Sequence, residues 1–231
     1  MNTRYSKILI DKDSVTKRVL NELRKEIITR SYAPGARLLE TKLAEKYDVS
    51  RGTIRSVAQE LSNEGLVEFL ATGGCVVVGI DEKVIRDTYS FRCLLEQQAG
   101  SILIASPSIR YTPMVEVLDL YTQREKEEAY QKNPLEYCAD LDIQFHQALV
   151  ACAENRPIYR AWCALSPVIR TLLTLNITED YWDEYVEKFY DHHKIMIDYM
   201  ILRDQRLLDE IQEQLLSGVE KAVRQLASLQ A

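Results

Sequence analysis

The stretch TKLAEKYDVSRGTIRSVAQELSNEG, residues 41–65, decides the fold of the first part of the chain. We expect Thr41 to cap a short helix and the triplet DVS (48–50) to form a tight turn after it. Ser50 is then placed to cap a second helix, and Gly65 is placed to end it. The buried face of the second helix is marked by apolar residues three and four positions apart: Ile54, Val57, Ala58 and Leu61. The stretch predicts two helices joined by a tight turn.

The segments on either side extend this motif. Before it, residues 14–28 carry an apolar residue at every fourth position, which is typical of an amphipathic helix, and the dipeptide PG (34–35) marks a turn. After it, residues 66–78 contain two short β-prone runs around the dipeptide GG (73–74), which predicts a hairpin. Helix, helix, tight turn, helix and hairpin is the order of a winged helix-turn-helix domain, and we place that domain at residues 1–79.

In such a domain the second helix of the motif enters the DNA major groove with its N-terminal end. Arg51 and Arg55 are four residues apart at that end, so they share one face of the helix. Arginine can contact guanine through two hydrogen bonds, and it also binds phosphates. Two solvated arginines on an exposed helix are the alternative interpretation. Hydroxyl groups and a glycine nearby suit contact with the DNA backbone, so the DNA-binding candidates are Thr41, Ser50, Arg51, Gly52, Thr53 and Arg55.

The charge of the chain is uneven. The 231 residues carry a formal net charge of −6, of which residues 1–80 contribute +3 (13 basic, 10 acidic) and residues 81–231 contribute −9 (16 basic, 25 acidic). A basic first part fits a nucleic-acid-binding role. No run of 18 uncharged apolar residues and no secretory leader is present, and the five cysteines form no CxxC pair. We therefore expect a cytoplasmic protein with reduced thiols and no membrane partner.

The rest of the chain, residues 80–231, is predicted to form an all-α helical bundle. Its pattern contains no strand, and its prolines fall at helix starts and kinks. The fold class is therefore mainly α: an N-terminal winged helix-turn-helix followed by a C-terminal helical bundle. The expected helices of the bundle are residues 82–105, 112–131, 134–153, 156–175, 179–201 and 204–229.

Polar residues on apolar helix faces mark a candidate site in this bundle. Arg92 lies within an apolar stripe and needs an anionic partner, which is either Glu96 or the carboxylate of a ligand. Asp142 and His146 are four residues apart, a spacing that suits either a shared metal ion or an Asp–His hydrogen bond. His193 faces inward with an apolar stripe on a separate helix, which favours the metal interpretation.

The sequence resembles the GntR-type transcription regulators, in the FadR subfamily with an FCD effector domain. Residues 34–68 (PGARLLETKLAEKYDVSRGTIRSVAQELSNEGLVE) are similar to the DNA-binding pattern of the family. Four short motifs look like FCD landmarks in the right order: RCLLE (92–96), DIQFH (142–146), ENRPIY (154–159) and HHKIM (192–196). The resemblance implies a homodimer that binds double-stranded DNA at a pseudo-palindromic operator. It also implies control by a small carboxylate effector, with the arginine matching Arg92 taking the carboxylate.

The resemblance further implies a divalent metal ion, such as zinc, nickel or manganese, held by one aspartate and three histidines. Asp142, His146 and His193 match the first three ligands, and Gln214 stands where the fourth is expected after a one-residue shift. An amide oxygen is a poorer zinc or nickel ligand than imidazole, so three outcomes stay open: a weakly bound metal, a metal completed by water and effector, or none. The wing, residues 71–75, has no basic residue, so contact with the minor groove there falls to the backbone or is missing.

The residues predict a DNA-binding regulator and not an enzyme, and the resemblance implies a repressor that is released from its operator by the effector. Two other functions compete with this one. A carboxylate with two imidazoles also serves metal-dependent enzymes, but no separate general base, nucleophile motif or phosphate loop is evident. A DNA-binding regulator with a vestigial, ligand-free cavity is the second competitor, because of Gln214.

Overall fold

The structure is a computed structural model that describes residues 15–71, 73–108, 110–176 and 182–228. The predicted starts of two helices, at residues 14 and 179, and the predicted end of the last one, at residue 229, lie outside these ranges. The described residues form two compact units: those up to Val84 together with Leu226 to Ser228, and those from Ile85 to Gln225. No described helix combines the length and the apolar character that crossing a membrane requires.

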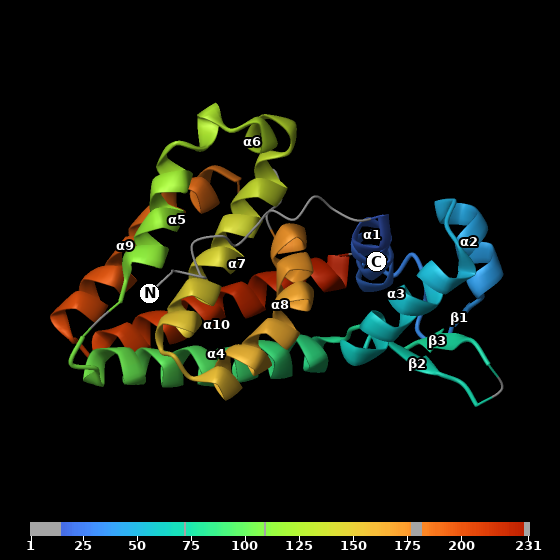
Figure 1. Cartoon of the computed structure of the whole chain (residues 1–231), viewed down its shortest axis with the longest axis horizontal. Coiled ribbons are helices and arrows are strands. Elements are labelled where there is room, and N and C mark those ends of the chain that lie inside the picture. The colour runs from blue at the N-terminus through green and yellow to red at the C-terminus, as the bar shows by residue number, and fades with distance from the viewer. Residues whose placement is uncertain (1–14, 72, 109, 177–181, 229–231) are drawn as a thin grey trace. The chain divides into compact units, whose positions relative to one another are not determined.

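The first unit is a three-helix domain with a small sheet, as the sequence predicts (Figure 1). Its sheet has the order β1-β3-β2, and both pairs are antiparallel, with Phe69 opposite Cys75 in the predicted hairpin. The first strand, β1, was not predicted, because two residues are too short for an alternating pattern. The elements are α1 (Val15–Ile28), β1 (Arg37–Leu38), α2 (Glu40–Tyr47), α3 (Arg51–Asn63), β2 (Val67–Phe69) and β3 (Cys75–Val77).

The predicted apolar stripes of α1 and α3 form the core of this unit. Val19 and Leu23 of α1 are buried, as are the four predicted residues of α3, whereas Val15 is 53% exposed because it is the first residue of α1. A buried ion pair accompanies this packing: Arg24 Nε and Nη2 lie 2.6 and 2.7 Å from the two carboxylate oxygens of Glu64. The pair joins α1 to the residue that caps the C-terminus of α3, and it is bidentate, the strongest geometry for arginine with a carboxylate.

The helix caps follow the prediction at α3 and depart from it at α2. Ser50 caps α3, since its Oγ accepts a hydrogen bond from the backbone N–H of Thr53 at 3.0 Å. Thr41 does not cap α2: the helix begins at Glu40, two residues before the start that a Thr41 cap predicts, and its N-cap is Leu39, which makes no side-chain cap. A glutamate in the first turn is favoured by the helix dipole, which explains the earlier start.

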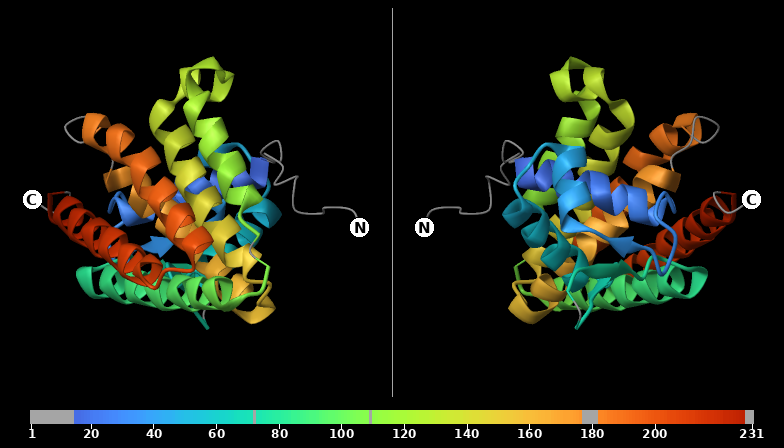
Figure 2. Two further views of the ribbon diagram at one scale, coloured as in Figure 1. Left: turned by 90° about the vertical axis from the view of Figure 1, so that its left-hand side faces the viewer. Right: turned by 90° about the vertical axis from the view of Figure 1, so that its right-hand side faces the viewer.

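The second unit contains only helices among its described residues. They are α4 (Glu82–Ala105, of which the first turn belongs to the first unit), α5 (Thr112–Thr122), the 3-10 turn η1 (Arg124–Lys126), α6 (Glu128–Lys132), α7 (Pro134–Cys152), α8 (Arg156–Asn176), α9 (Trp182–Leu202) and α10 (Arg206–Ser228). In Figures 1 and 2, α5 and α7 lie side by side and rise steeply from the level of α4 and α10.

One predicted helix is wrong in its extent. Residues 112–131 do not form a single helix, because the chain leaves helical geometry at Gln123 and again at Glu127. Side chains satisfy carbonyl oxygens at the end of α5: Thr122 Oγ1 donates to the carbonyl of Asp119 at 2.8 Å, and Arg124 Nη1 donates to that of Tyr121 at 3.0 Å. Such side-chain hydrogen bonds offer the backbone an alternative to continuing the helix.

The helices α4 and α10 run antiparallel and in contact. Arg86 Nη1 lies 2.7 Å from Glu220 Oε1 near one end of the pair, and Gln97 Nε2 donates to the carbonyl of Leu208 at 2.9 Å near the other. At Gly100 the two helices approach so closely that a Cβ atom would lie 3.1 Å from a methyl group of Leu208. The close contact of α4 with α10 therefore depends on the absence of a side chain at Gly100.

Replacing Gly100 by valine is therefore expected to lower the stability of the second unit by about 1–3 kcal/mol through overpacking. The measurement is the midpoint of thermal unfolding by circular dichroism. Gly52→Ala is the matched control, because a Cβ atom there meets only Ser50 Oγ, at the ordinary contact distance of 3.6 Å. An unchanged midpoint in Gly100→Val would show that α10 can move away from α4 without loss.

Candidate functional site

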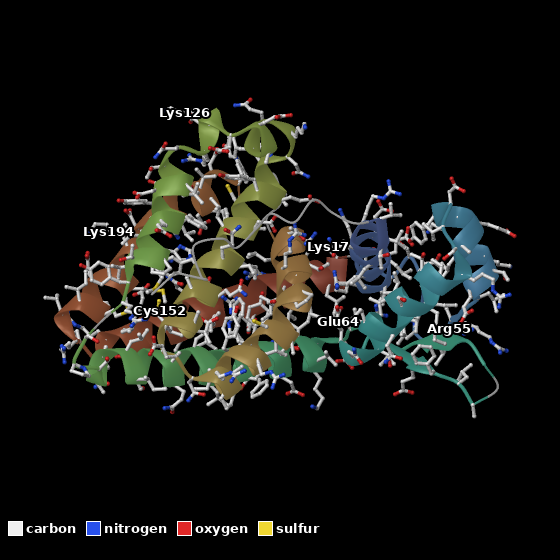
Figure 3. All side chains as sticks on the ribbon, viewed as in Figure 1. Lys17, Arg55, Glu64, Lys126, Cys152 and Lys194 are labelled. Atoms are coloured by element: carbon white, nitrogen blue, oxygen red, sulfur yellow. The ribbon has the colours of Figure 1, made fainter. Side chains whose placement is uncertain are left out.

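The exposed end of α3 presents the two predicted arginines. The side chains of Arg51 and Arg55 are 65% and 69% exposed. Both face Glu40 at the start of α2: Arg55 Nε and Nη2 each lie 3.2 Å from one of its carboxylate oxygens, and Arg51 Nη2 lies 3.6 Å away. Hydrogen bonds from Arg55 are the main cause that lowers the pKa of Glu40, so the carboxylate is charged at neutral pH. Figure 3 labels Arg55 on α3.

The other four DNA-binding candidates lie around these arginines. Ser50 and Thr53 are occupied with each other, since Ser50 Oγ caps α3 and lies 2.9 Å from Thr53 Oγ1. Gly52 is exposed in the first turn of α3, where the lack of a side chain leaves the backbone accessible. Thr41 is exposed in the first turn of α2. The structure therefore brings all six candidates to the neighbouring N-terminal ends of two helices.

A further exposed cation, which the sequence analysis did not single out, lies beside the wing. Arg37 of β1 is exposed, and its Nη2 donates a hydrogen bond to the carbonyl of Gly73 at 2.9 Å, in the hairpin that forms the wing. Of the wing, Thr72 lies outside the described residues, and Gly73 and Gly74 have φ angles of 86° and 79°. A cation therefore stands beside the wing although the wing itself contains none. Only the pairing of β1 with β3 reveals this, because 36 positions separate the two residues.

In the second unit, α7 and α9 bring together the three predicted metal ligands. Asp142, His146 and His193 are buried, and each offers one ligand atom within 4.8 Å of the others. His146 Nε2 lies 3.7 Å from Asp142 Oδ1, and His193 Nε2 lies 3.9 Å from Asp142 Oδ2. Two ligands of a tetrahedral zinc ion, with bonds of about 2.1 Å, are roughly 3.4 Å apart, so a small contraction brings these atoms to ligation distance.

The orientation of His193 suits a metal ligand. Its Nδ1 lies 2.6 Å from the backbone carbonyl of Phe189, which can only accept, so Nδ1 carries the hydrogen and Nε2 keeps its lone pair. Nε2 is buried and has no hydrogen-bond partner among the described residues. Burial, against the opposing effect of Asp142, lowers the pKa of His193 to about 4, so the ring is neutral at physiological pH, as ligation requires.

Behind His146 stands a buried carboxylate. Glu96 of α4 is fully buried, and its Oε1 accepts hydrogen bonds from Arg92 Nε at 2.7 Å and from Trp162 Nε1 of α8 at 2.8 Å. Its other oxygen lies 2.8 Å from His146 Nδ1, although these two atoms do not meet hydrogen-bonding geometry. Burial alone would raise the pKa of Glu96, but Arg92 and then His146 outweigh it and hold that pKa well below the usual range. A carboxylate in this position orients a metal-ligating histidine.

The sequence offered Glu96 or a ligand as the partner of Arg92, and the structure leaves room for both. Glu96 binds the Nε side of the guanidinium, whereas Nη2 is buried without a hydrogen-bond partner among the described residues and lies 4.0 Å from Asp142 Oδ1. The contribution of Trp162 was not predicted, because nothing in the spacing of residues links it to Glu96, which is 66 positions away.

These groups open into a cavity of about 160 Å³. On the same measure one water molecule needs about 10–15 Å³. The cavity therefore has room for a small organic acid but not for a large acyl conjugate. Gln214 of α10 is half-buried in the cavity wall, and its Nε2 lies 3.4 Å from Glu210 Oε1, so its amide oxygen is the atom left for another contact. The remaining described lining residues are Tyr89, Arg92, Asp142, His146, Leu173, Glu184, Tyr185, Lys188, Phe189, His192, His193, Leu215, Ser217, Gly218 and Lys221.

The donor set therefore fits a divalent metal ion. Two imidazoles and one carboxylate are a combination that zinc, nickel and manganese accept, and the unpartnered Nε2 of His193 has an oriented lone pair. The three protein ligands leave positions for water, an effector or Gln214.

Comparison with known proteins assigns this arrangement to a family. Residues 15–77 match the model described as bacterial regulatory proteins, gntR family, and residues 87–218 match the model of the FCD domain. The chain belongs to the GntR family of transcription regulators and carries an FCD domain. It is a DNA-binding transcription regulator and not an enzyme.

Its relatives include the gluconate operon transcriptional repressors of two bacilli. That of Bacillus subtilis (strain 168) is 26% identical over 219 residues, which cover 94% of this chain and 88% of the relative, and that of Bacillus licheniformis is 27% identical over 228 residues, covering 97% and 91%.

Among solved structures, Lar of Listeria monocytogenes superposes with a TM-score of 0.67 at 17% identity, covering 92% of this chain and 98% of Lar. Escherichia coli McbR/YncC superposes with a TM-score of 0.59 at 16% identity, covering 92% of this chain and 99% of McbR/YncC. These likenesses support the fold.

Glu96→Gln is expected to destabilise the protein by about 3–5 kcal/mol, because it leaves the buried charge of Arg92 without its anionic partner. The measurement is urea unfolding followed by tryptophan fluorescence, since Trp162 contacts the altered group. Glu128→Gln is the control: Glu128 forms an exposed i,i+4 pair with Lys132, and its loss is expected to leave the stability nearly unchanged.

The double variant Arg92→Met, Glu96→Leu removes both charges and is expected to recover much of that loss, because buried ion pairs contribute little beyond an apolar pair of similar volume. A Glu96→Gln variant as stable as the parent protein would show that Asp142 or solvent compensates Arg92.

Proposed function

We propose that this regulator is a homodimeric repressor that is released from its operator by a small carboxylate effector, which binds beside a divalent metal ion in the FCD domain. The observation that carries the proposal is the cavity in which the buried side chains of Asp142, His146 and His193 lie beside Arg92. The relatives named as repressors support the direction of regulation, and the gluconate operons in their names point to a hydroxy acid as the class of ligand. We keep the boundary between the two functional domains at residues 79 and 80.

On the DNA side, we propose that α3 enters the major groove. Arg51 and Arg55 contact base edges, Ser50, Gly52, Thr53 and Thr41 approach phosphates, and Arg37 lies beside the wing, where the minor groove runs. Exposed arginines at the N-terminal end of α3 support this assignment. The ion pairs with Glu40 are solvent-exposed and contribute little, so DNA can replace that carboxylate.

Dimerisation is supported by apolar side chains that one copy leaves in solvent. On α4, Phe91 and Leu94 are 46% and 63% exposed, and Leu216 of α10 is 56% exposed. Large apolar side chains grouped on adjoining helices mark protein contacts. A two-fold dimer presents two copies of α3 to successive major grooves, so its operator is a pseudo-palindrome.

The DNA-binding test is selection of sites from a random double-stranded library by the full-length chain, followed by affinity measurement on the selected site. Arg51→Ala and Arg55→Ala are each expected to weaken binding about ten-fold or more, since a bidentate base contact contributes about 1–3 kcal/mol. Arg110→Ala is the control, because Arg110 is an exposed arginine of the second unit paired with Glu154.

Selected sites should contain an inverted repeat if the dimer is the binding form. Undiminished affinity in both α3 variants would contradict the proposed interface, and selected sites without symmetry would contradict the dimer.

On the effector side, we propose that the metal and Arg92 share the effector carboxylate. Three protein ligands leave open positions on the metal, and Arg92 Nη2 is the buried donor without a hydrogen-bond partner among the described residues. For the effector to release DNA it must prefer one dimer geometry over the other. Gln214 lies on α10, which packs against α4, so a ligand in this cavity contacts both helices through which we expect that preference to act.

The metal is tested by elemental mass spectrometry of untagged protein purified without chelator. We expect near one equivalent of a divalent metal per chain, lost in His193→Ala and retained in His192→Ala, since His192 is exposed on the neighbouring position of α9. Gln214→His supplies the imidazole that the chain lacks, and it is expected to slow metal loss during dialysis against a chelator.

No metal after loading with zinc, nickel or manganese would contradict the metal site. Arg92 would then be the main anchor of the effector, or the cavity would be vestigial, and a thermal-shift screen of organic acids without metal separates these two cases.

A further inference from the structure

Glu40 is an acid placed among the cations of the first unit. It lies in the first turn of α2, where the helix dipole favours a negative charge, and Arg51 and Arg55 of α3 converge on it. Its side chain is 16% exposed, against 65% and 69% for the two arginines. A carboxylate at a surface that meets phosphates weakens their binding, so its position here calls for a role other than affinity.

The contact of Glu40 with Arg55 uses one particular edge of the guanidinium group. Nε and Nη2 form the side edge, and each lies 3.2 Å from one carboxylate oxygen of Glu40. Nη1 and the second hydrogen of Nη2 form the end edge, and among the described residues Nη1 has no hydrogen-bond partner. Two parallel N–H groups suit O6 and N7 of guanine. Arg55 can therefore hold Glu40 and a guanine at the same time.

Arg51 is held less firmly than Arg55. Its Nη2 lies 3.6 Å from Glu40 Oε2, which is beyond a hydrogen bond, and the same oxygen already accepts from Arg55 Nη2. DNA can replace Glu40 at Arg51 without disturbing the pair with Arg55. The replacement that the exposure of these pairs permits is therefore needed at one arginine only.

An ordinary surface ion pair between α2 and α3 is the simplest alternative explanation of Glu40. Exposed pairs of this kind contribute little to stability, and they carry no information about DNA. The two explanations differ in what they predict: an ordinary pair affects every DNA sequence alike, whereas an acid that orients one arginine affects the base which that arginine contacts.

We propose that Glu40 is a positioning residue for reading DNA: it holds the side edge of Arg55 and directs the end edge to one guanine of the operator. The proposal rests on the proposed function, since it takes the entry of α3 into the major groove from it. Holding the guanidinium before DNA arrives reduces the side-chain freedom that is lost on binding. The negative charge weakens binding to phosphates of any sequence, so Glu40 favours specificity over affinity.

The test measures base discrimination by the full-length chain on duplexes that carry the site selected from the random library. The base pair read by Arg55 is the one whose substitution weakens binding by the parent protein but not by Arg55→Ala. This penalty is expected to be about ten-fold or more in the parent. In Glu40→Gln it is expected to fall by about three-fold or more, because the neutral amide cannot accept from both Nε and Nη2. Affinity for a random-sequence duplex should rise, because a negative charge is removed.

Two further variants separate geometry from charge. Glu40→Asp keeps the charge on a side chain one methylene shorter, so it is expected to lose discrimination without a gain in affinity for the random duplex. Glu45→Gln removes the same charge from an exposed position of the same helix that pairs with neither arginine, and it is expected to keep the full penalty. Midpoints of thermal unfolding show whether each variant is folded.

A double variant tests whether Glu40 acts through Arg55. In the Arg55→Ala background, Glu40→Gln is expected to cost no further discrimination at any base pair, because both changes remove the same contact. A further loss there would show that Glu40 acts on another group, and the positioning role would be wrong.

The results separate this inference from the proposed function. If either Glu40 variant keeps the full penalty, or if Glu45→Gln loses it as well, the positioning role is wrong and the α3 interface stands. Equal tightening of Glu40→Gln on selected and random duplexes would likewise show that Glu40 only repels DNA. If Arg55→Ala keeps every base-pair penalty of the parent, both are wrong, because Arg55 then reads no base.

Discussion

The FCD domain depends on one buried carboxylate. Glu96 has no exposed surface, and a charge in that position is tolerable only if the surrounding helices supply partners. Arg92 supplies one from the same helix, His146 from α7 and Trp162 from α8. These interactions fix the relative positions of three helices and hold the imidazole of His146 with its Nε2 towards Asp142. The position of His146 in the proposed metal site is therefore supported by groups that are not themselves proposed as metal ligands.

The DNA-binding domain contains one arginine–glutamate ion pair that is buried and another that is exposed. Arg24 and Glu64 form a buried, bidentate pair that holds α1 against the end of α3, and its loss would leave an unpaired buried charge. Arg55 and Glu40 form a similar pair in solvent, where such a pair contributes little. The buried pair stabilises the scaffold. We propose that Glu40 keeps Arg51 and Arg55 directed to one place and leaves them available to DNA, because these ion pairs are exposed.

Helix α4 links the winged domain along the chain to the residues of the cavity. It carries Arg92 and Glu96, it packs along α10 at Gly100, and only four residues separate its start from the last strand of the winged domain. We propose that an effector in the cavity acts on α4, which has a short covalent path to the hairpin. Such coupling has a physical basis only if the effector binds the two geometries with different affinity, and we propose that groups from both helices in the cavity wall supply that difference.

The sequence by itself determined the order of elements and the faces that are buried. Regular spacing of apolar residues placed α1, α3 and most helices of the bundle, because a helix face repeats every three to four positions and its burial is dictated locally. The same spacing turned Arg92, Asp142, His146 and His193 inward, and the cap at Ser50 followed from a short-range hydrogen bond. Prediction from the sequence was wrong at Thr41 and at residues 112–131. There, side-chain interactions of the next few residues determine whether the helix continues or ends.

Tertiary structure alone decided which distant residues share a site. Glu40 with Arg55, Arg37 with Gly73, Trp162 with Glu96 and Lys221 with Glu184 are 15 to 66 positions apart, and no periodicity links them. Their pairing depends on how helices and strands pack, and that is set by the fit of whole faces rather than by any single residue. Periodicity tells which side of a helix is buried, but the partner it meets there is known only when the helices are packed.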